Sequence, residues 1–263
     1  MSYTTIRFAV ADGVAALTLN RPEHRNRCNA HMLEELRDVL KHLHTREDTR
    51  VLLLKGEGRD FCAGHDLGPH QAVTGSEVPD LGAALDRGYN PLLRALHGLP
   101  VPVLCAVQGS AAGAGACLAL ACDIVIAARS ARFVLDGCRF GLIPDAGGTW
   151  FLPRQIGLAR ATALAMLGEA VEAPLAWQWG MIWQCVDDAA LDGAAQQLAR
   201  RLAVQPTRTL GFIKHALHQS LLKPLDDQLD VERDYQRLAG RTADFREGLA
   251  AWQEQREPVF KGH

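Results

Sequence analysis

The sequence predicts an α/β protein whose C-terminal third is helical, and three observations support this prediction. Strand-like apolar runs alternate with helix-spaced apolar residues up to about residue 148, a pattern typical of parallel sheets with helical crossovers. A glycine-rich loop, Gly109 to Gly115, separates one such strand from the helix that follows it. From about Thr149 onward, helical segments separated by Gly or Pro predominate.

The chain is expected to begin with a pair of strands. Residues 5–10 and 14–20 flank Asp12-Gly13, a dipeptide suited to a tight hairpin turn because glycine accepts a positive φ. Helix-spaced leucines and methionine then predict a helix over residues 30–45, followed by a short strand over residues 51–55. The elements expected next are an irregular segment at 56–80, a helix near 81–96, a strand at 101–107, a helix at 113–122, and strands at 124–128 and 132–135.

The remaining predicted elements are all helices. Their spacing places them at residues 159–167, 189–203, 207–220, 225–238 and 243–255. The histidines on these helices, including His215 and His218, are expected to face solvent. We therefore divide the chain into an α/β core, residues 1–200, and a helical C-terminal region, residues 201–263.

The composition argues against nucleic acid and membranes as partners. The 263 residues contain 28 Lys and Arg against 30 Asp and Glu, so the chain has no basic excess for nucleic acid or anionic lipid. Residues 98–122 are free of charged residues and long enough to cross a bilayer. However, Pro100, Pro102 and the following glycines forbid one continuous helix. The termini show no targeting signal, so the expected location is the cytoplasm.

The cysteines do not predict a metal site or a disulfide framework. There are seven, an odd number, with no CxxC pair, and several lie inside apolar runs. Structural zinc sites and disulfide-rich domains use regular, paired spacings instead. We expect no metal.

The glycine loop predicts a site for an anion or an oxyanion. It follows a strand and begins a helix, so its backbone N–H groups and the positive end of the helix dipole face whatever binds there. A dehydrogenase is disfavoured because none of the three tyrosines has a lysine four residues later, and Ser110 is misplaced for a hydrolase elbow. Glycines that only allow close packing remain an alternative.

A second small-residue loop strengthens the prediction of a site. The segment FCAGHDL, residues 61–67, follows the predicted strand 51–55. Ligands of parallel sheets sit beyond the carboxyl ends of the strands. The two loops are therefore expected to converge on one ligand.

These loops carry a family resemblance. The segments FCAGHDL, PVLCAVQGSAAGAGACLALACDIVIAA and FGLIPDAGGTWFLPR resemble the three core motifs of the enoyl-CoA hydratase/isomerase, or crotonase, superfamily. The resemblance extends to Asn20-Arg21-Pro22-Glu23 near the start and to residues 242–261 at the end. It implies a crotonase-like spiral of ββα units with a helical C-terminal trimerisation region, assembled as a trimer or a hexamer.

The resemblance also implies a chemistry and the residues for it. Superfamily members stabilise a thioester enolate with two backbone N–H groups, which the resemblance places at Ala63 and Ala114, with Gly113 allowing close approach. No cofactor is implied, because the CoA thioester is the substrate. The residues implied to contact the acyl-CoA are Arg25, His65, Asp66, Leu67 and Lys261, with Arg25 and Lys261 at the phosphates.

The identity of the proton-moving carboxylate favours an isomerase over a hydratase. The two glutamates of the family's hydratases are replaced here by Cys117 and Gly137. Asp145 matches the aspartate of the family's isomerases, and its apolar neighbours predict a raised pKa suited to proton transfer. Two alternatives remain open: Asp145 is a helix N-cap, or Asp136 is the acid/base, although its offset points it to the other face of a strand.

Within the superfamily, several segments are most similar to the isomerases that rearrange ring-epoxidised phenylacetyl-CoA in aromatic catabolism. The leading hypothesis is an acyl-CoA isomerase acting on that ring epoxide, on a Δ3-enoyl-CoA, or on both. An enoyl-CoA hydratase and a non-catalytic acyl-CoA-binding subunit are the alternative hypotheses.

Overall fold

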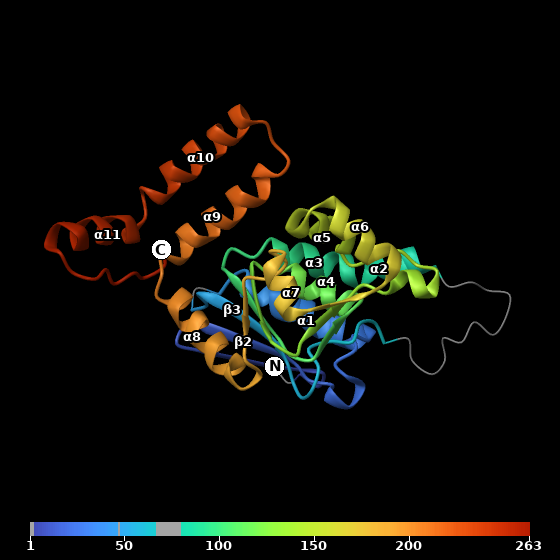
Figure 1. The fold of residues 1–263 in the computed structure, drawn as a ribbon. Coiled ribbons are helices and arrows are strands. Elements are labelled where there is room, and N and C mark those ends of the chain that lie inside the picture. The colour runs from blue at the N-terminus through green and yellow to red at the C-terminus, as the bar shows by residue number, and fades with distance from the viewer. Residues whose placement is uncertain (1–2, 47, 67–79) are drawn as a thin grey trace.

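The structure is a computed structural model that describes residues 3–46, 48–66 and 80–263. Its main sheet has six strands in the order β1-β2-β3-β4-β6-β9, with helices packed around it (Figure 1). The β1/β2 hairpin is antiparallel and every other pair is parallel. The strands are β1 (Ile6–Ala11), β2 (Val14–Leu19), β3 (Val51–Gly56), β4 (Val103–Val107), β6 (Ile124–Ala128) and β9 (Gln184–Val186).

The predicted hairpin turn is confirmed in detail. Asp12 and Gly13 both have positive φ, 50° and 77°, as the tight turn between paired strands requires. A Cβ on Gly13 would lie 3.1 Å from the side chain of Arg50. Glycine therefore satisfies both the turn and the packing of the segment before β3.

A small second sheet lies beside the glycine loop. Its strands are β5 (Ser110–Ala112), β7 (Arg132–Val134) and β8 (Ala170–Glu172), in the order β5-β7-β8. The prediction that the chain is helical beyond Thr149 is wrong at β8 and at β9. Each of these strands has only three residues, too few to show the alternation that identifies a strand from sequence.

The predicted helices are present with small changes in their ends. One expected helix, near 81–96, is two, because Gly88 breaks it between α2 and α3. Helix α5 and helix α7 were not predicted. The helices are α1 (Ala30–Leu43), α2 (Leu81–Arg87), α3 (Tyr89–His97), α4 (Ala114–Leu120), α5 (Gly148–Ile156), α6 (Leu158–Leu167), α7 (Ala173–Gln178), α8 (Leu191–Ala203), α9 (Thr207–Ser220), α10 (Leu225–Ala239) and α11 (Ala243–Glu254), with short 3₁₀ turns η1 (Pro22–His24), η2 (Gly137–Phe140) and η3 (Asp188–Ala190).

The uncharged segment 98–122 forms the centre of the core. All five residues of β4 and all seven of α4 are buried. Burial on every side removes the need for polar residues, because a central parallel strand is covered on both faces. Within the described ranges, none of the helices has the length and apolar character that crossing a membrane requires.

The C-terminal helices α9 to α11 extend away from the core as an arm (Figure 1). The tail returns from the arm to the core, where Arg50 donates hydrogen bonds to the carbonyl oxygens of Phe260 at 2.9 Å and Gln205 at 2.7 Å. The predicted division at residue 200 falls inside α8, whose Ala199 and Ala203 are buried.

Helix α9 is attached to α3 and α4 by a buried polar cluster. Lys214 forms an ion pair of 2.9 Å with Asp123, which follows α4. Next to this pair, the rings of His218 and His97 stack with centroids 3.9 Å apart. His215 and His218 are partly buried, so the expectation that both face solvent is wrong. Helical spacing did not reveal that this face of α9 packs on the core.

This cluster is expected to make the stability of the protein fall in mild acid. Burial, together with the charges of His97, Lys214 and His215, lowers the pKa of His218 to about 4. Between about pH 6.5 and pH 4 the unfolded chain therefore binds a proton that the folded chain excludes. The free energy of unfolding should drop across this window by up to about 3 kcal/mol from His218 alone. Urea unfolding measured from pH 7.5 to pH 4.5 tests this.

The matched variants for this prediction are His218→Gln and His24→Gln. His218→Gln should flatten the pH dependence of the free energy of unfolding, whereas His24→Gln, which changes an exposed histidine of η1, should leave it as in the wild type. Equal pH slopes in the wild type and in His218→Gln would contradict the prediction.

Candidate active site

Two loops at the carboxyl ends of β3 and β4 are held against each other by backbone hydrogen bonds. Cys62 N–H donates to Ser110 O at 3.1 Å, and Ala112 N–H donates to Cys62 O at 2.9 Å. A Cβ on Gly115 would lie 2.3 Å from Cys62 O. Only glycine at this position lets the start of α4 approach the first loop so closely. The predicted convergence of the two loops is confirmed.

The first loop offers the backbone N–H of His65, not that of Ala63. Ala63 N–H donates to Arg25 O at 3.0 Å, so it is already used within the fold. The prediction that Ala63 supplies an oxyanion donor is therefore wrong in this structure. Cys28 pairs with both neighbours of His65, accepting from Asp66 N at 2.9 Å and donating to Gly64 O at 2.8 Å.

This pairing turns the N–H of His65 away from Cys28, because in a parallel bridge the middle residue directs its own groups to the opposite side. His65 N–H has no hydrogen-bond acceptor among the residues that the structure describes. This amide is therefore available to a ligand.

The second loop offers the N–H of Ala114. Ala114 is the first residue of α4 and follows Gly113, whose φ of 50° only glycine adopts readily. The N–H groups of the first helical turn have no partner inside the helix. A Cβ on Gly64 would lie 3.9 Å from Ala114 N, so the residue before His65 lies beside Ala114. The two available amides therefore belong to adjacent segments.

Asp145 lies in the turn between η2 and α5. Helix α5 begins at Gly148, and its N-cap position, Gly147, has no side-chain cap hydrogen bond, so the interpretation of Asp145 as a helix N-cap is wrong. Burial raises the pKa of Asp145, and the nearby His65 opposes part of that shift. A carboxyl group with a raised pKa is suited to taking up and returning a proton near neutral pH.

Cys117 is buried against the start of α5, three residues after Asp145 in the chain. Burial and then the negative charge of Asp145 raise the pKa of the Cys117 thiol to about 12, so Cys117 stays neutral at physiological pH. A Cβ on Gly148 would lie 2.8 Å from the Cys117 sulfur, which places α4 against the start of α5. The carboxylate is therefore next to an uncharged thiol.

A buried tyrosine, which the sequence did not reveal, supports the first loop from α3. The hydroxyl of Tyr89 lies 3.2 Å from Nδ1 of His65. Burial raises the pKa of Tyr89 well above its ordinary value, with Asp145 among the charges that add to the shift. The only signal in the sequence was the apolar face of α3, which marks Tyr89 as a core residue and says nothing of its hydroxyl.

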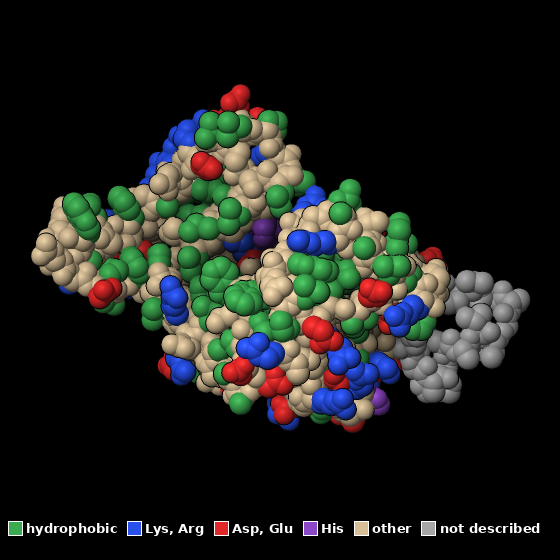
Figure 2. All heavy atoms as spheres, viewed as in Figure 1, with side chains coloured by type: hydrophobic (Ala, Val, Ile, Leu, Met, Phe, Trp, Pro, Cys, Tyr) green, Lys and Arg blue, Asp and Glu red, His purple; other side chains and the backbone are tan. Residues whose placement is uncertain are grey.

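An open cavity of about 450 Å³ lies between α3 and α5, with Gly147, two residues after Asp145, in its lining. Its lining is largely aromatic and apolar, which suits a hydrophobic acyl group. A hollow is also visible between the C-terminal arm and the helices α5 and α6 (Figure 2). The lining residues of the cavity are Asn90, Leu93, Arg94, His97, Gly147, Trp150 and Phe151.

Residues 9–263 match the sequence model of the family described as enoyl-CoA hydratase/isomerase. The chain belongs to the enoyl-CoA hydratase/isomerase family. It is 56% identical over 253 residues to the "1,2-epoxyphenylacetyl-CoA isomerase" of Escherichia coli K12, covering 96% of this chain and 97% of the relative. It is 46% identical to a protein of Rhodobacter capsulatus named "Probable enoyl-CoA hydratase", over the full length of both chains.

The fold of the family is confirmed by solved structures. The crystal structure of an enoyl-CoA hydratase from Bacillus anthracis superposes with a TM-score of 0.92 at 32% identity, covering 99% of this chain and all of that one. As a member of the enoyl-CoA hydratase/isomerase family, the protein is an enzyme with a crotonase fold.

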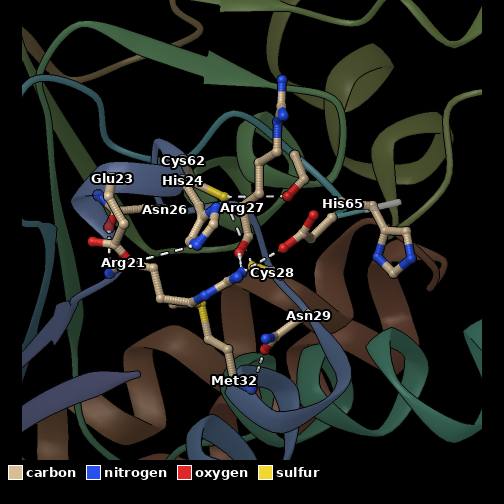
Figure 3. A network of polar contacts seen from close by, with 12 residues as sticks. Arg21, Glu23, His24, Asn26, Arg27, Cys28, Asn29, Met32, Cys62 and His65 are labelled. Atoms are coloured by element: carbon tan, nitrogen blue, oxygen red, sulfur yellow. Dashed lines mark hydrogen bonds and ion pairs between the residues drawn. The ribbon is translucent and has the colours of Figure 1, made fainter. Parts of the chain in front are cut away.

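The residues expected to contact the CoA group come from separate segments of the chain. Arg25 forms an ion pair of 2.8 Å with the buried Asp60 while its side chain stays 52% exposed. Asp66 pairs with Arg21 at 2.8 Å, in the polar network of Figure 3. Lys261 lies on the C-terminal tail, where its N–H donates to Asp244. Leu67 lies outside the described residues.

The same network contains basic residues that the sequence did not single out. Arg21 donates to Asp66 and to the carbonyl of Arg27, and Arg27 is exposed at the surface of this segment. Figure 3 shows Arg21 and Arg27 in one close-up with Cys62 and His65. Within residues 3–46, 48–66 and 80–263, no cluster of three or more His, Cys, Asp or Glu side chains has the arrangement of a metal site.

Proposed function

We propose that the protein is an acyl-CoA isomerase in which Asp145 moves the proton and the N–H groups of His65 and Ala114 hold the thioester oxygen. One observation carries the proposal: a half-buried carboxyl group whose pKa is raised by burial and is affected by the charge of His65 accompanies two adjacent loops with amides that have no acceptor among the described residues. The 56% identical relative named as a 1,2-epoxyphenylacetyl-CoA isomerase supports a ring-1,2-epoxyphenylacetyl-CoA as substrate. Isomerisation of a Δ3-enoyl-CoA would use the same carboxyl group and the same two N–H groups.

The proposed reaction begins when Asp145 removes a proton from the carbon next to the thioester carbonyl. The electron pair of the broken C–H bond moves toward the carbonyl oxygen, which becomes an enolate oxygen. Two N–H donors fixed in advance stabilise this charge without reorganising. With a Δ3-enoyl-CoA, Asp145 then returns the proton at the far carbon of the double bond, which moves into conjugation with the thioester. With the ring epoxide, the C–C bond between the two epoxide carbons also breaks, so that the ring expands to an oxepin, and Asp145 returns the proton to a ring carbon.

Hydration is disfavoured because the two positions that match the glutamates of the family's hydratases, Cys117 and Gly137, carry no carboxylate. Cys117 is neutral and buried, and Gly137 has no side chain. Neither provides the charge needed for general-base activation of water. A non-catalytic acyl-CoA-binding subunit does not account for a carboxyl group whose pKa is raised beside two available amides.

The CoA phosphates are proposed to bind at the exposed basic residues of the segment 21–27. The Arg25 guanidinium is half exposed, and Arg27 is also exposed. Lys261 is proposed to contribute from the C-terminal tail. The enzyme needs no cofactor in this proposal, because the CoA thioester is itself the substrate, and we place it in the cytoplasm.

The C-terminal arm is proposed to be the oligomerisation region of a trimer or of a hexamer made of two trimers. The division between the core, residues 1–200, and this region, residues 201–263, is part of the proposal. The arm exposes large apolar side chains, which is typical of surfaces that associate. They include Leu217, Leu221, Leu222, Leu225, Leu229 and Trp252.

A product assay with wild-type enzyme tests the proposed function. Ring-1,2-epoxyphenylacetyl-CoA, a 3-enoyl-CoA and crotonyl-CoA are incubated in deuterium oxide and the products are analysed by mass spectrometry. Isomerisation of either of the first two with deuterium incorporation supports the proposal. Water addition to crotonyl-CoA as the main activity would favour a hydratase, and tight binding without exchange or turnover would favour a binding subunit.

A further inference from the structure

The imidazole of His65 is held in a defined orientation at the edge of the candidate site. Its Nδ1 lies 3.2 Å from the Tyr89 hydroxyl, and the two rings meet edge to face with centroids 5.7 Å apart. Tyr89 is 4% exposed, whereas His65 is exposed. The tyrosine is therefore a fixed support from α3, and the imidazole is the part that a ligand meets.

The hydroxyl of Tyr89 lies where it can donate to Nδ1 or accept from it, because a tyrosine O–H does both and a neutral imidazole accepts at one nitrogen and donates from the other. In the arrangement proposed for this site, Tyr89 donates, and its raised pKa keeps the hydroxyl protonated for this role. The ring proton of His65 is then on Nε2, which has no partner among the described side chains. In this tautomer, His65 presents an N–H donor.

The position of this donor relative to the acyl group follows from the backbone of the same residue. In the proposed function, the N–H of His65 holds the thioester oxygen, so its side chain starts directly beside the thioester. His65 lowers the pKa of Asp145, and Asp145 contributes to the raised pKa of Tyr89. In the proposed complex, the imidazole and the carboxyl group approach the same acyl carbon.

A ring epoxide places an oxygen at this point, and a linear enoyl chain does not. In a ring-1,2-epoxyphenylacetyl thioester, the epoxide oxygen is bonded to the ring carbon next to the carbon that loses its proton. That oxygen is a hydrogen-bond acceptor within reach of a donor beside the thioester. A site built to hydrogen-bond a polar group discriminates against substrates that lack it, because its donor is then left unpaired.

We propose that the Nε2–H of His65, oriented by Tyr89, donates a hydrogen bond to the epoxide oxygen and thereby selects ring-epoxide acyl groups over linear enoyl chains. Tyr89 is a positioning residue in this arrangement, because it acts through His65. The inference rests on the proposed function, since it takes the acyl-CoA to be bound at His65 and Ala114.

The test is the ratio of kcat/KM for ring-1,2-epoxyphenylacetyl-CoA to kcat/KM for a 3-enoyl-CoA. His65→Phe keeps the backbone N–H and the ring shape but removes the donor, so the ratio should fall by about ten- to a hundredfold. His65→Gln places an amide N–H near the position of Nε2 and should recover most of the ratio. Tyr89→Phe should lower the ratio by about threefold, because the proton is then free to move to Nδ1.

The matched control is His44→Phe, which changes an exposed histidine at the end of α1 and should leave the ratio as in the wild type. A ratio unchanged in His65→Phe, or equally low in His65→Gln and His65→Phe, would overturn the role of His65. Failure of the wild type to isomerise either ester would instead reject the proposed function, so the two failures are distinguishable.

Discussion

Asp145→Asn is expected to lower kcat for isomerisation by about 10²–10⁴-fold, the usual contribution of a positioned general acid/base. Asparagine has nearly the same shape as aspartate but takes up no proton, so the C–H bond beside the thioester is no longer broken efficiently. The acyl-CoA should still bind, because the two backbone amides and the cavity are unchanged. Solvent-deuterium exchange at the substrate carbon should be lost together with turnover.

The control for this prediction is Asp136→Asn, which removes the other aspartate of the same segment. Its kcat should stay within a few fold of the wild type. If Asp136→Asn lost more activity than Asp145→Asn, the acid/base would have to be assigned to Asp136. Binding of a non-reactive CoA thioester, measured by calorimetry, shows whether either variant has lost the substrate site instead.

Ala114→Pro is expected to lower kcat by about 10²–10³-fold, the cost of losing one donor to an oxyanion. Proline has no backbone N–H, and at the first position of a helix this removes no intrahelical hydrogen bond. Ala114 is the first residue of α4, so the helix should form as before. The substitution therefore removes the proposed donor with little change to the rest of the fold.

The matched control is Leu158→Pro, another proline at the first position of a helix that follows a glycine. Leu158 is 74% exposed and is distant in sequence from both loops. Both variants should unfold at nearly the wild-type temperature, and only Ala114→Pro should lose activity. Full activity in a folded Ala114→Pro protein would exclude the N–H of Ala114 as an oxyanion donor.

Much of the candidate site was predictable because its parts are local. The glycine loop, the loop at residues 61–67 and Asp145 each stand out within a few residues of sequence. The choice between the amides of Ala63 and His65 is different, because it depends on hydrogen bonds with Arg25 and Cys28, from a distant segment. No pattern within the loop itself reveals which amide those residues use.

The same distinction, between local sequence features and contacts with distant segments, explains where the observed fold differs from the predicted one. The long strands and amphipathic helices follow from periodicity, whereas β8 and β9 exist because short segments meet the edges of sheets formed by distant residues. His218 looked like a surface residue of α9 until its neighbours His97 and Asp123 were placed beside it. Tyr89 likewise acquires a role only through its distance to His65.

Arg25, proposed to contact the CoA phosphates, is connected to both loops of the candidate site. Its carbonyl holds Ala63, two residues before the amide assigned to the thioester oxygen, while its guanidinium is paired with Asp60. Asp60 in turn accepts a hydrogen bond from Ser110 N–H, on the other loop. A phosphate that displaces the Arg25 guanidinium from Asp60 would therefore disturb hydrogen bonds that position both loops. In the proposed complex, the phosphate end of CoA and its reactive carbonyl are bound by parts of one connected hydrogen-bond network.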